Sequence, residues 1–385
     1  MSWKRSSVLA LALALAAMVV ACTSAESNNA EPRTFETQYQ TIRLVQVASG
    51  LEHPWSVAFL PDGEMLVTER PGRLLRLSAD GSERQEIRGV PEVVARNQGG
   101  LMEVVLHPAF EENRWVYLTY SKGDSDETTT ALVRGRLSGD ELEDLEELFV
   151  QDRKSEPGRH YGSRLAWMAD GTLLMSIGDR GSDPPRGQDL GDHAGTLLRL
   201  NDDGSVPADN PFVDDPDALD EIYTYGNRNI QGLVVDPASG IIWSTEHGPR
   251  GGDELNVMRP GENYGWPRAT LGLDYRTQED FPDSEARRID GMVDPVHEFL
   301  PTLAPSGLAM VTTDRFEGWQ GDLLAGGLRS RRILRLVVTE DEVIHGEELL
   351  LDEIGRIRDV RQGPEGDIYV LTDARNGGLY RIEPN

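Results

Sequence analysis

The chain contains a single cysteine among its 385 residues, so no disulfide can form within it. The one long apolar run lies at the N-terminus, and no long stretch shows the 3.6-residue periodicity of amphipathic helices. Basic residues are also too few to balance the acids, since 38 Lys and Arg stand against 66 Asp and Glu, for a net charge of −28. Stability must therefore come from a hydrophobic core and any bound metal, while nucleic acid and anionic lipid are poor partners.

Residues 1–21 have the pattern of a bacterial export signal. Lys4 and Arg5 precede "VLALALALAAMVV", an apolar stretch too short to span a bilayer as a stable anchor. The following "VVAC" resembles a lipobox with Cys22 as the lipidated residue, and an ordinary cleaved signal with an incidental cysteine is the alternative. Residues 22–41 are polar and non-periodic, as expected of a tether. We therefore predict a periplasmic protein that touches the membrane only through a lipid on Cys22.

A hairpin pattern recurs along residues 42–385, with an apolar strand, a turn rich in Asp, Gly or Pro, and a second apolar strand. Most copies continue into a third strand of basic and apolar residues, such as "GRLLRLS" and "RRILRLVV". Such copies, about 57 residues each, predict an all-β fold, a six-bladed β-propeller that forms the catalytic domain. A sandwich of repeated hairpins is the alternative, but the regular recurrence favours a propeller. The six copies begin at Pro54, Gly99, Gly162, Ile230, Pro305 and Ile357.

Three segments fall outside the hairpin pattern. The acidic residues 138–150 fit either an outer strand or a short surface helix. Residues 202–222 and 271–300 are long, polar and rich in Pro and Asp, which is typical of loops. We expect these two inserts to cover one face of the propeller, because propellers carry their function on such loops.

Several polar residues stand at the same position in different copies, just before or at the first strand. Because the first strand of a blade lines the channel, these side chains should converge on one pocket. Arg356 and Arg358 are two residues apart, so on a strand both point to one face. In so acidic a chain, a basic inner cluster suggests a bound polyanion, although each arginine could instead pair with a neighbouring acid. The residues at this position are Gln98, His160, Arg228, Asn229, Arg356 and Arg358.

The stretch "STEHGPRGGDELNVMRPGENYGWP", residues 244–267, has too many Gly and Pro for a plain blade corner. Its Gly248-Pro249 pair leaves backbone carbonyls exposed, and a hard cation such as calcium takes carbonyl and carboxylate oxygens. Glu254 and the region of Tyr264 are spaced for a loop that folds back on itself. The pattern is not an EF-hand, so a turn-rich connection with a solvated acidic pair is an equal alternative. No second histidine stands at zinc spacing from the neighbouring "EH".

Together these motifs resemble those of the soluble pyrroloquinoline-quinone (PQQ)-dependent sugar dehydrogenases, in particular the bacterial aldose sugar dehydrogenase branch. The resemblance covers residues 42–384 and rests on several separate motifs in the right order. It implies a six-bladed propeller, PQQ over the channel mouth, and calcium. The motifs are "PWSVAFLPDG", "NQGGL", "GRHYGSRL", "GNRNIQGL", "EHGPRGGDELN…NYGWP" and "GRIRDVR…DIYVLTD".

The resemblance also assigns roles to individual residues. His160 matches the catalytic base, and Arg228 would offset negative charge that builds on the reduced cofactor. Arg329, in "GGLRSRR", stands where the family commonly has Lys, and the two side chains are not equivalent in size or hydrogen bonding. The remaining residues that match cofactor contacts, besides Arg228, are Gln98, Asn229, Tyr275, Arg356 and Arg358.

Four residues match the family's two calcium sites. Gly248 and Pro249 match the positions whose carbonyls hold the calcium of the active site. Glu254 and Tyr264 match a second, structural site.

The implied reaction oxidises the anomeric carbon of an aldose sugar to a lactone, with PQQ as hydride acceptor and calcium as Lewis acid. Electrons then pass to an acceptor that the sequence does not identify. A calcium-dependent lactonase is one alternative, and it would need carboxylates around a central metal and no basic cluster. A non-enzymatic propeller that binds glycans is another, because the fold alone does not determine function.

Overall fold

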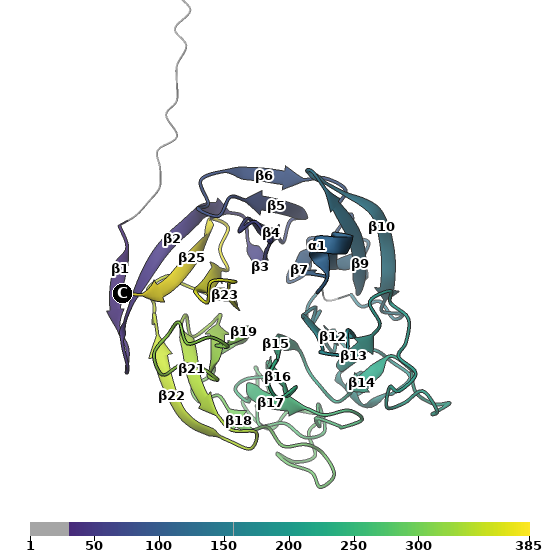
Figure 1. Ribbon diagram of the computed structural model, residues 1–385. Helices are drawn as coiled ribbons and strands as arrows, with labels where there is room; N and C mark the ends of the chain where they lie inside the picture. The colour runs from purple at the N-terminus through teal and green to yellow at the C-terminus, as the bar shows by residue number, and fades with distance from the viewer. Residues whose placement is uncertain (1–30, 157) are drawn as a thin grey trace, which may run out of the picture.

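The computed structural model describes residues 31–156 and 158–385, in which twenty-five strands form six sheets around a central channel (Figure 1). The predicted all-β class and six-bladed β-propeller are confirmed. The only helices of the described residues are α1 (Phe110–Asn113) and the short 3-10 helix η1 (Pro184–Gln188). None of the described helices is long and apolar enough to cross a membrane. The predicted signal and Cys22 lie outside the described residues.

Five blades are four-stranded antiparallel sheets whose strands follow the chain from the channel outward. Blades 1 and 2 comprise β3 (Pro54–Phe59), β4 (Met65–Glu69), β5 (Arg73–Leu77), β6 (Arg84–Ile87), β7 (Leu101–Leu106), β8 (Trp115–Gly123), β9 (Thr128–Ser138) and β10 (Glu141–Val150). Blades 3 and 4 comprise β11 (Leu165–Trp167), β12 (Leu173–Ile177), β13 (Thr196–Leu200), β14 (Ile222–Thr224), β15 (Ile230–Val235), β16 (Ile242–Glu246), β17 (Glu254–Met258) and β18 (His297–Glu298). Blade 5 comprises β19 (Pro305–Met310), β20 (Leu323–Gly327), β21 (Ile333–Val338) and β22 (Val343–Leu349).

Blade 6 combines the two ends of the described chain and so closes the ring. From the channel outward it contains β23 (Ile357–Gln362), β24 (Ile368–Thr372), β25 (Gly377–Pro384), β2 (Thr41–Leu51) and β1 (Arg33–Glu36). Because β2 pairs with β25 along its whole length, opening the ring would break a full strand ladder. Radial closure of this kind leaves only short sheet edges.

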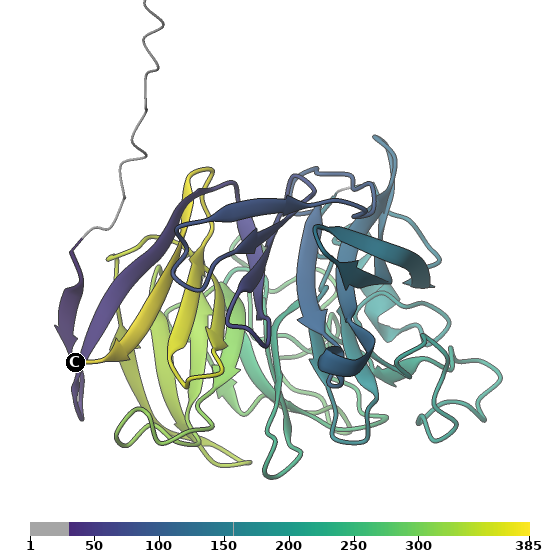
Figure 2. The same ribbon diagram turned by 45° about the horizontal axis from the view of Figure 1, so that its top comes forward.

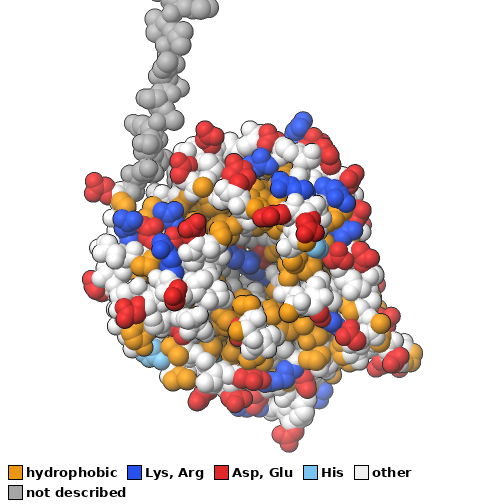
Figure 3. Space-filling model, in the orientation of Figure 1, with side chains coloured by type: hydrophobic (Ala, Val, Ile, Leu, Met, Phe, Trp, Pro, Cys, Tyr) orange, Lys and Arg blue, Asp and Glu red, His pale blue; other side chains and the backbone are white. Residues whose placement is uncertain are grey.

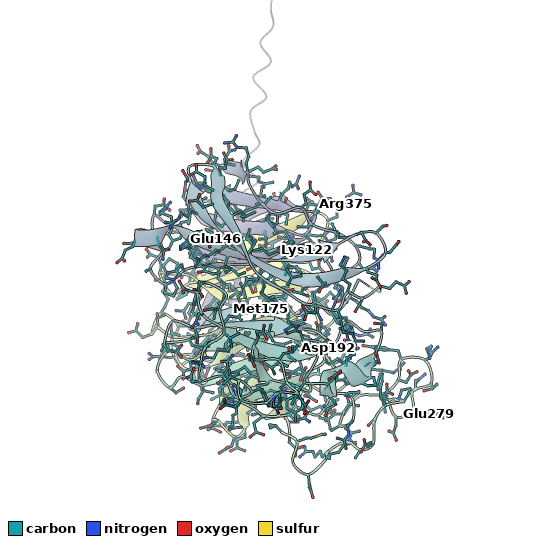
Figure 4. All side chains as sticks on the ribbon, turned by 90° about the vertical axis from the view of Figure 1, so that its right-hand side faces the viewer. Lys122, Glu146, Met175, Asp192, Glu279 and Arg375 are labelled. Atoms are coloured by element: carbon teal, nitrogen blue, oxygen red, sulfur yellow. The ribbon has the colours of Figure 1, made fainter. Side chains whose placement is uncertain are left out.

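Two of the segments outside the repeats are strands. Residues 138–150 contain β10, so the outer-strand interpretation is correct, and Glu146 of this strand pairs with Arg134 on the outer surface (Figure 4). Strand β1 lies within the predicted tether, where Phe35 packs against a buried hydrophobic cluster. A tether at residues 22–41 is therefore too long, because part of it adds a fifth strand to blade 6.

Apolar side chains of neighbouring sheets meet between the blades and form the core. Leu66 and Leu74 of blade 1, for example, share a buried cluster with Val116 and Leu118 of blade 2. Burying such a side chain fully contributes about 1.5–3 kcal/mol, and the pattern repeats around the ring. The core therefore holds the blades side by side and keeps the inner strands parallel to the channel.

The inner strands all begin at one face of the propeller and end at the other. Helix α1 follows the end of β7, so it marks the face at which the inner strands end. This face is turned toward the viewer in Figures 1 and 2. This α1 face is hollowed at its centre, with Lys or Arg side chains deep in the hollow (Figure 3). Glu279 and Arg375 come from loops of the opposite face, which lies at the right of Figure 4, with Arg375 in the upper part and Glu279 in the lower part.

Candidate active site

A cavity of about 190 Å³ lies at the face where the inner strands begin. It brings together every residue that the sequence assigned to catalysis or cofactor binding except Arg329. All six blades contribute, as the convergence of blade starts predicted. Its lining consists of Trp55, Arg70, Gln98, Met102, His160, Tyr161, Gly162, Arg228, Asn229, Gln231, His247, Tyr275, Leu328, Arg356, Arg358 and Asp373.

Bulges at the start of the inner strands place several of these side chains. In four blades the pairing register between the inner strand and the second strand shifts within the first residues of the inner strand. These inner strands are β3, β7, β15 and β23. The residues skipped by these shifts include Trp55, Met102, Gln231 and Arg358, all of which line the cavity. A bulge frees a residue from the ladder and re-aims its side chain, so the local irregularity builds the site.

His160 is held from two sides. Its backbone N–H donates to Gln98 Oε1 at 2.8 Å, and its ring Nδ1 lies 2.6 Å from Asp179 Oδ1. Its left-handed backbone (φ 52°) brings its carbonyl against Gly178, where a Cβ atom would lie 2.1 Å from that oxygen. Because Nδ1 faces a carboxylate, it carries the proton of the neutral ring, and Nε2 is the nitrogen that can accept one.

The charges around His160 favour the neutral imidazole. Burial lowers the pKa of His160 below its ordinary value of 6.5, Arg228 acts in the same direction, and Asp179 opposes both. The neighbouring His247 is more strongly affected, since burial and Arg228 lower its pKa to about 3. Both rings are therefore uncharged near neutral pH, and His160 is ready to act as a base.

The cavity has more cations than its acids can balance. Four arginines line it, and Asp373 is the only carboxylate in its lining. Arg356 and Arg358 both reach Asp373 Oδ2, at 2.9 and 3.1 Å, so the prediction that they share a face is correct. The Nε atom of Arg358 is buried without a hydrogen-bond partner in the described part of the chain. This arrangement fits a ligand with several carboxylates, as PQQ has.

Arg228 shows the same incomplete pairing. Its guanidinium donates to the His247 carbonyl at 3.2 Å and lies 5.1 Å from the centre of the Trp266 ring. No described residue pairs with its buried Nε atom. A buried donor without a partner is costly, so a ligand acceptor beside Arg228 would remove that cost.

Two carboxylates, one buried and one partly buried, lie next to this cavity, in a position that fits a cation. Glu246 and Glu254 face each other across β16 and β17, and Asn256 donates to both, at 3.2 and 3.3 Å. Burial raises the pKa of Glu246 to about 7, and burial together with Glu246 raises that of Glu254 well above its ordinary value. Like charges directly opposite on a sheet are destabilising, and a bound cation would neutralise them.

The space between these groups has the size of one small ion. A cavity of about 10 Å³ is lined by Glu246, Gly248, Glu254 and Tyr264, among others, so three of the four predicted calcium residues meet there. The Tyr264 hydroxyl already donates to the Val257 carbonyl at 2.6 Å, which leaves its backbone oxygen as the possible ligand. Within the described chain, no cluster of three or more His, Cys, Asp or Glu side chains could hold a metal. A cation here would therefore rely on backbone oxygens as well.

Pro249 and Arg329 lie elsewhere. Both line an adjoining cavity of about 490 Å³, which shares His247 and Tyr275 with the first. The exposed side chain of Arg329 therefore lines the adjoining cavity and not the one that holds the other predicted cofactor contacts. Tyr275 itself is 61% exposed, so it forms part of the open rim.

A larger cavity, of about 940 Å³, opens on the α1 face. Acidic side chains predominate among its charged residues, and its arginines are paired, as Arg315 is with Asp367 at 2.6 Å. The two polar inserts, residues 202–222 and 271–300, lie at different faces of the propeller. Asp202 lies 3.6 Å from His107 on the α1 side, whereas Tyr275 lines the cavity at the other face. The expectation that both inserts cover one face is therefore wrong.

Three acids of the site, Asp179, Glu246 and Asp373, are not among the residues predicted from the sequence. Each stands at the end of the second strand of its blade, in "IGDRG", "STEHG" and "VLTDA". Glu69, in "VTERP", holds the same position in blade 1. Aligning the second strands as well as the first would have shown this repeated acid. The second strand ends at the face where the first strand begins, so Glu246 meets Arg228, and Asp373 meets Arg356 and Arg358.

Known proteins share this architecture. Residues 51–381 match the sequence model of the glucose/sorbosone dehydrogenase family. The aldose sugar dehydrogenase YliI of Escherichia coli is 40% identical over 348 residues, which cover 89% of this chain and 93% of that protein. The solved soluble aldose sugar dehydrogenase of Escherichia coli, in its apo form, superposes with a TM-score of 0.86 and 39% identity over 89% of this chain and 100% of the other.

A more distant relative was solved with cofactor. The PQQ-bound form of the aldose sugar dehydrogenase from Streptomyces coelicolor superposes with a TM-score of 0.72 and 28% identity, over 92% of this chain and 98% of the other. These similarities agree with the motifs and with the converging blade starts. The chain belongs to the glucose/sorbosone dehydrogenase family.

Proposed function

We propose that this chain is a PQQ- and calcium-dependent aldose dehydrogenase that oxidises the anomeric carbon of a sugar to a lactone. The observation that carries the proposal is the His160–Asp179 pair, 2.6 Å apart, beside a cavity with four arginines and one acid. A base and an excess of cations suit a reaction that removes a proton next to an anionic cofactor. The PQQ-bound relative supports the choice of cofactor.

The cofactors would be held by different parts of the site. Arg356, Arg358 and Arg228 have the charge and the spare donors for the carboxylates of PQQ, and Gln98 and Asn229 add polar contacts. The carbonyls of Gly248 and Pro249, which are adjacent in the chain although they line neighbouring cavities, would hold the calcium of the active site, and Glu254 with Tyr264 a structural one. When bound, PQQ supplies a hydride acceptor and calcium a Lewis acid.

The residues of the chain would carry the proton chemistry. Nε2 of His160 takes the proton of the anomeric hydroxyl while hydride leaves the anomeric carbon, so the sugar loses two electrons and becomes a lactone. Asp179 orients the ring and stabilises the imidazolium that forms. Arg228 offsets the negative charge that develops on the cofactor side. An acceptor of unknown identity then takes the electrons.

Reconstitution tests the proposal. The calcium-loaded protein is mixed with PQQ, and oxidation of a panel of aldoses is followed with an artificial acceptor dye. We expect sugar-dependent reduction of the dye, abolished by a calcium chelator. His160→Gln should lower kcat by about a hundredfold or more, the range for loss of a general base, with PQQ binding retained. Absence of sugar oxidation in the reconstituted wild type would contradict the proposal.

The alternatives have less support. A calcium-dependent lactonase needs carboxylates around a central metal, whereas arginines line this cavity. A glycan-binding propeller has no need for a buried base paired with a carboxylate. Export through residues 1–21 and a lipid anchor at Cys22 remain predictions from the sequence pattern alone.

A further inference from the structure

Asp179, the partner of His160, has an unequal set of hydrogen bonds. Its Oδ1 atom accepts two hydrogen bonds, from the His160 ring Nδ1 at 2.6 Å and from the backbone N–H of Gly181 at 2.9 Å. Its Oδ2 atom accepts one hydrogen bond within the described structure, from the indole Nε1 of Trp266 at 2.9 Å. The Asp179 side chain is only 1% exposed, so water does not replace a lost donor readily. Within the described chain, Trp266 is therefore the one donor to this second oxygen.

Trp266 is itself firmly placed. It is 4% exposed, its ring packs against Phe281 with centroids 4.7 Å apart, and its backbone N–H donates to Gly226 at 2.7 Å. Gln188 donates to its carbonyl at 2.7 Å. Ring packing and backbone hydrogen bonds thus fix the position of Trp266 independently of its contact with Asp179.

The same tryptophan also borders the two carboxylates of the small cavity. It lines the small cavity with Glu246 and Glu254, while the Arg228 backbone donates to Glu246 at 2.7 Å and accepts from the Asp179 N–H at 2.8 Å. Asp179 is therefore tied to this region through its backbone and through its side chain. Only the side-chain tie can be removed without changing the path of the main chain.

We propose that Trp266 is a positioning residue: its indole N–H holds the Asp179 carboxylate in the rotamer that orients His160. Without this donor, Oδ2 would be buried and unpaired, and the carboxylate would turn toward another donor. The inference rests on the proposed function for its catalytic meaning, but the geometry that it predicts can be measured without turnover.

The first measurement is the low-field proton resonance of the hydrogen-bonded Nδ1–H of His160, recorded on calcium-loaded protein and assigned by its loss in His160→Gln. In Trp266→Phe, which keeps a ring and removes the donor, we expect this resonance to broaden or disappear. Trp319→Phe is the matched control, because Trp319 is fully buried and its Nε1 has no partner within the described chain. An unchanged resonance in Trp266→Phe would overturn the proposal.

The second measurement is the pH profile of kcat for the PQQ-reconstituted enzyme. The ionisable groups that act on His160 are Asp179, Arg228, Arg159 and the neutral His247. Asp179 is the one that raises the pKa of His160, so loosening it should shift the acid limb of the profile to lower pH. We expect kcat to fall on the order of tenfold with KM nearly constant, since the base is misplaced and the substrate is not. An acid limb that stays in place would also overturn the proposal.

A folding defect would not leave the question open. Trp266→benzothienylalanine keeps the shape of the indole, replaces its N–H by sulfur, and should give the same two results. If wild-type protein shows no sugar oxidation, the proposed function fails while the resonance still tests the role of Trp266. If sugar oxidation occurs and both Trp266 variants behave as wild type, the positioning role fails alone.

Discussion

Two clusters of charge lie along the channel, and they differ in how completely they are paired. The channel cluster consists of Glu103, Arg164, Asp359 and Arg361, and the site arginines are Arg70, Arg228, Arg356 and Arg358. The first has two cations and two anions. The second has four cations around one carboxylate. The contrast separates arginines that the protein pairs completely from arginines that keep donors free for a ligand.

The channel cluster is satisfied by the protein itself. Arg164 donates to Glu103 at 3.1 Å and to Asp359 at 2.8 Å, and Arg361 reaches the same two acids at 2.6 and 2.9 Å. Its members come from three different blades, and Gly307 of a fourth gives Asp359 room, because a Cβ there would lie 2.4 Å from its carboxylate. The cluster therefore joins blades that the chain connects only at a distance.

The site arginines remain incomplete. Arg358 is only 7% exposed, yet its Nε has no partner in the described structure, and the same is true of Arg228. Natural proteins pair nearly all buried polar groups, so two unpaired arginine donors at a cavity are available to a ligand. Burial alone does not distinguish Arg228 and Arg358 from the channel cluster, whereas the balance of donors and acceptors does.

The largest effect is expected from breaking the channel cluster. Arg164→Met would leave Glu103 and Asp359 with one cation between them, which typically costs about 3–5 kcal/mol of unfolding free energy. Chemical denaturation of the calcium-loaded protein measures this loss. Arg164→Lys, which keeps the charge, should lose less. A loss below about 1 kcal/mol, the value of an exposed pair, would show that the channel cluster does not stabilise the ring.

At the site arginines we expect the opposite result, a loss of PQQ affinity with little loss of stability. Arg358→Ala should weaken PQQ binding by about 1.5–3 kcal/mol, the usual contribution of a hydrogen bond to a charged group. The unfolding free energy should change little, because the variant removes one of several crowded cations. Calorimetric titration of PQQ beside a melting curve separates the two quantities. Unchanged affinity with a large loss of stability would place Arg358 with the channel cluster and weaken the case for a quinone site.

Features of the fold and site that leave a local sequence pattern could be predicted, whereas pairings between distant parts of the chain could not. The six hairpins were visible because alternating apolar strands and Gly or Asp turns leave a local pattern, and the basic residues before them were visible by their matched positions. The pairing of Arg164 with Asp359 was not, since the residues are 195 positions apart and meet only when the ring closes. For the same reason β1 and β2 could not be assigned to the last blade from the local sequence.

A smaller effect, on the melting temperature, is expected when the pH is lowered. Burial would raise the pKa of Asp373, but Arg358 and Arg356 outweigh it and hold the pKa below the ordinary 3.8. A carboxyl with a depressed pKa stabilises the folded state above its unfolded pKa, and this contribution is lost as pH falls through the folded value. Wild type should therefore melt higher than Asp373→Asn at pH 6, and the gap should narrow below pH 4. A gap that stays constant down to pH 2 would contradict this pairing.

The smallest effect is expected at Arg329, the exposed arginine of the adjoining cavity. An exposed charge in water interacts weakly with a ligand, so Arg329→Ala should change PQQ affinity by at most about 1 kcal/mol. Arg329→Lys keeps the charge and should be milder still. The effect of the alanine should also shrink in 1 M salt, where the screening length falls to about 3 Å. If Arg329→Ala instead costs as much as Arg358→Ala, and salt does not reduce the loss, then PQQ extends into the adjoining cavity and buries Arg329 on binding. The cofactor site would then comprise both cavities.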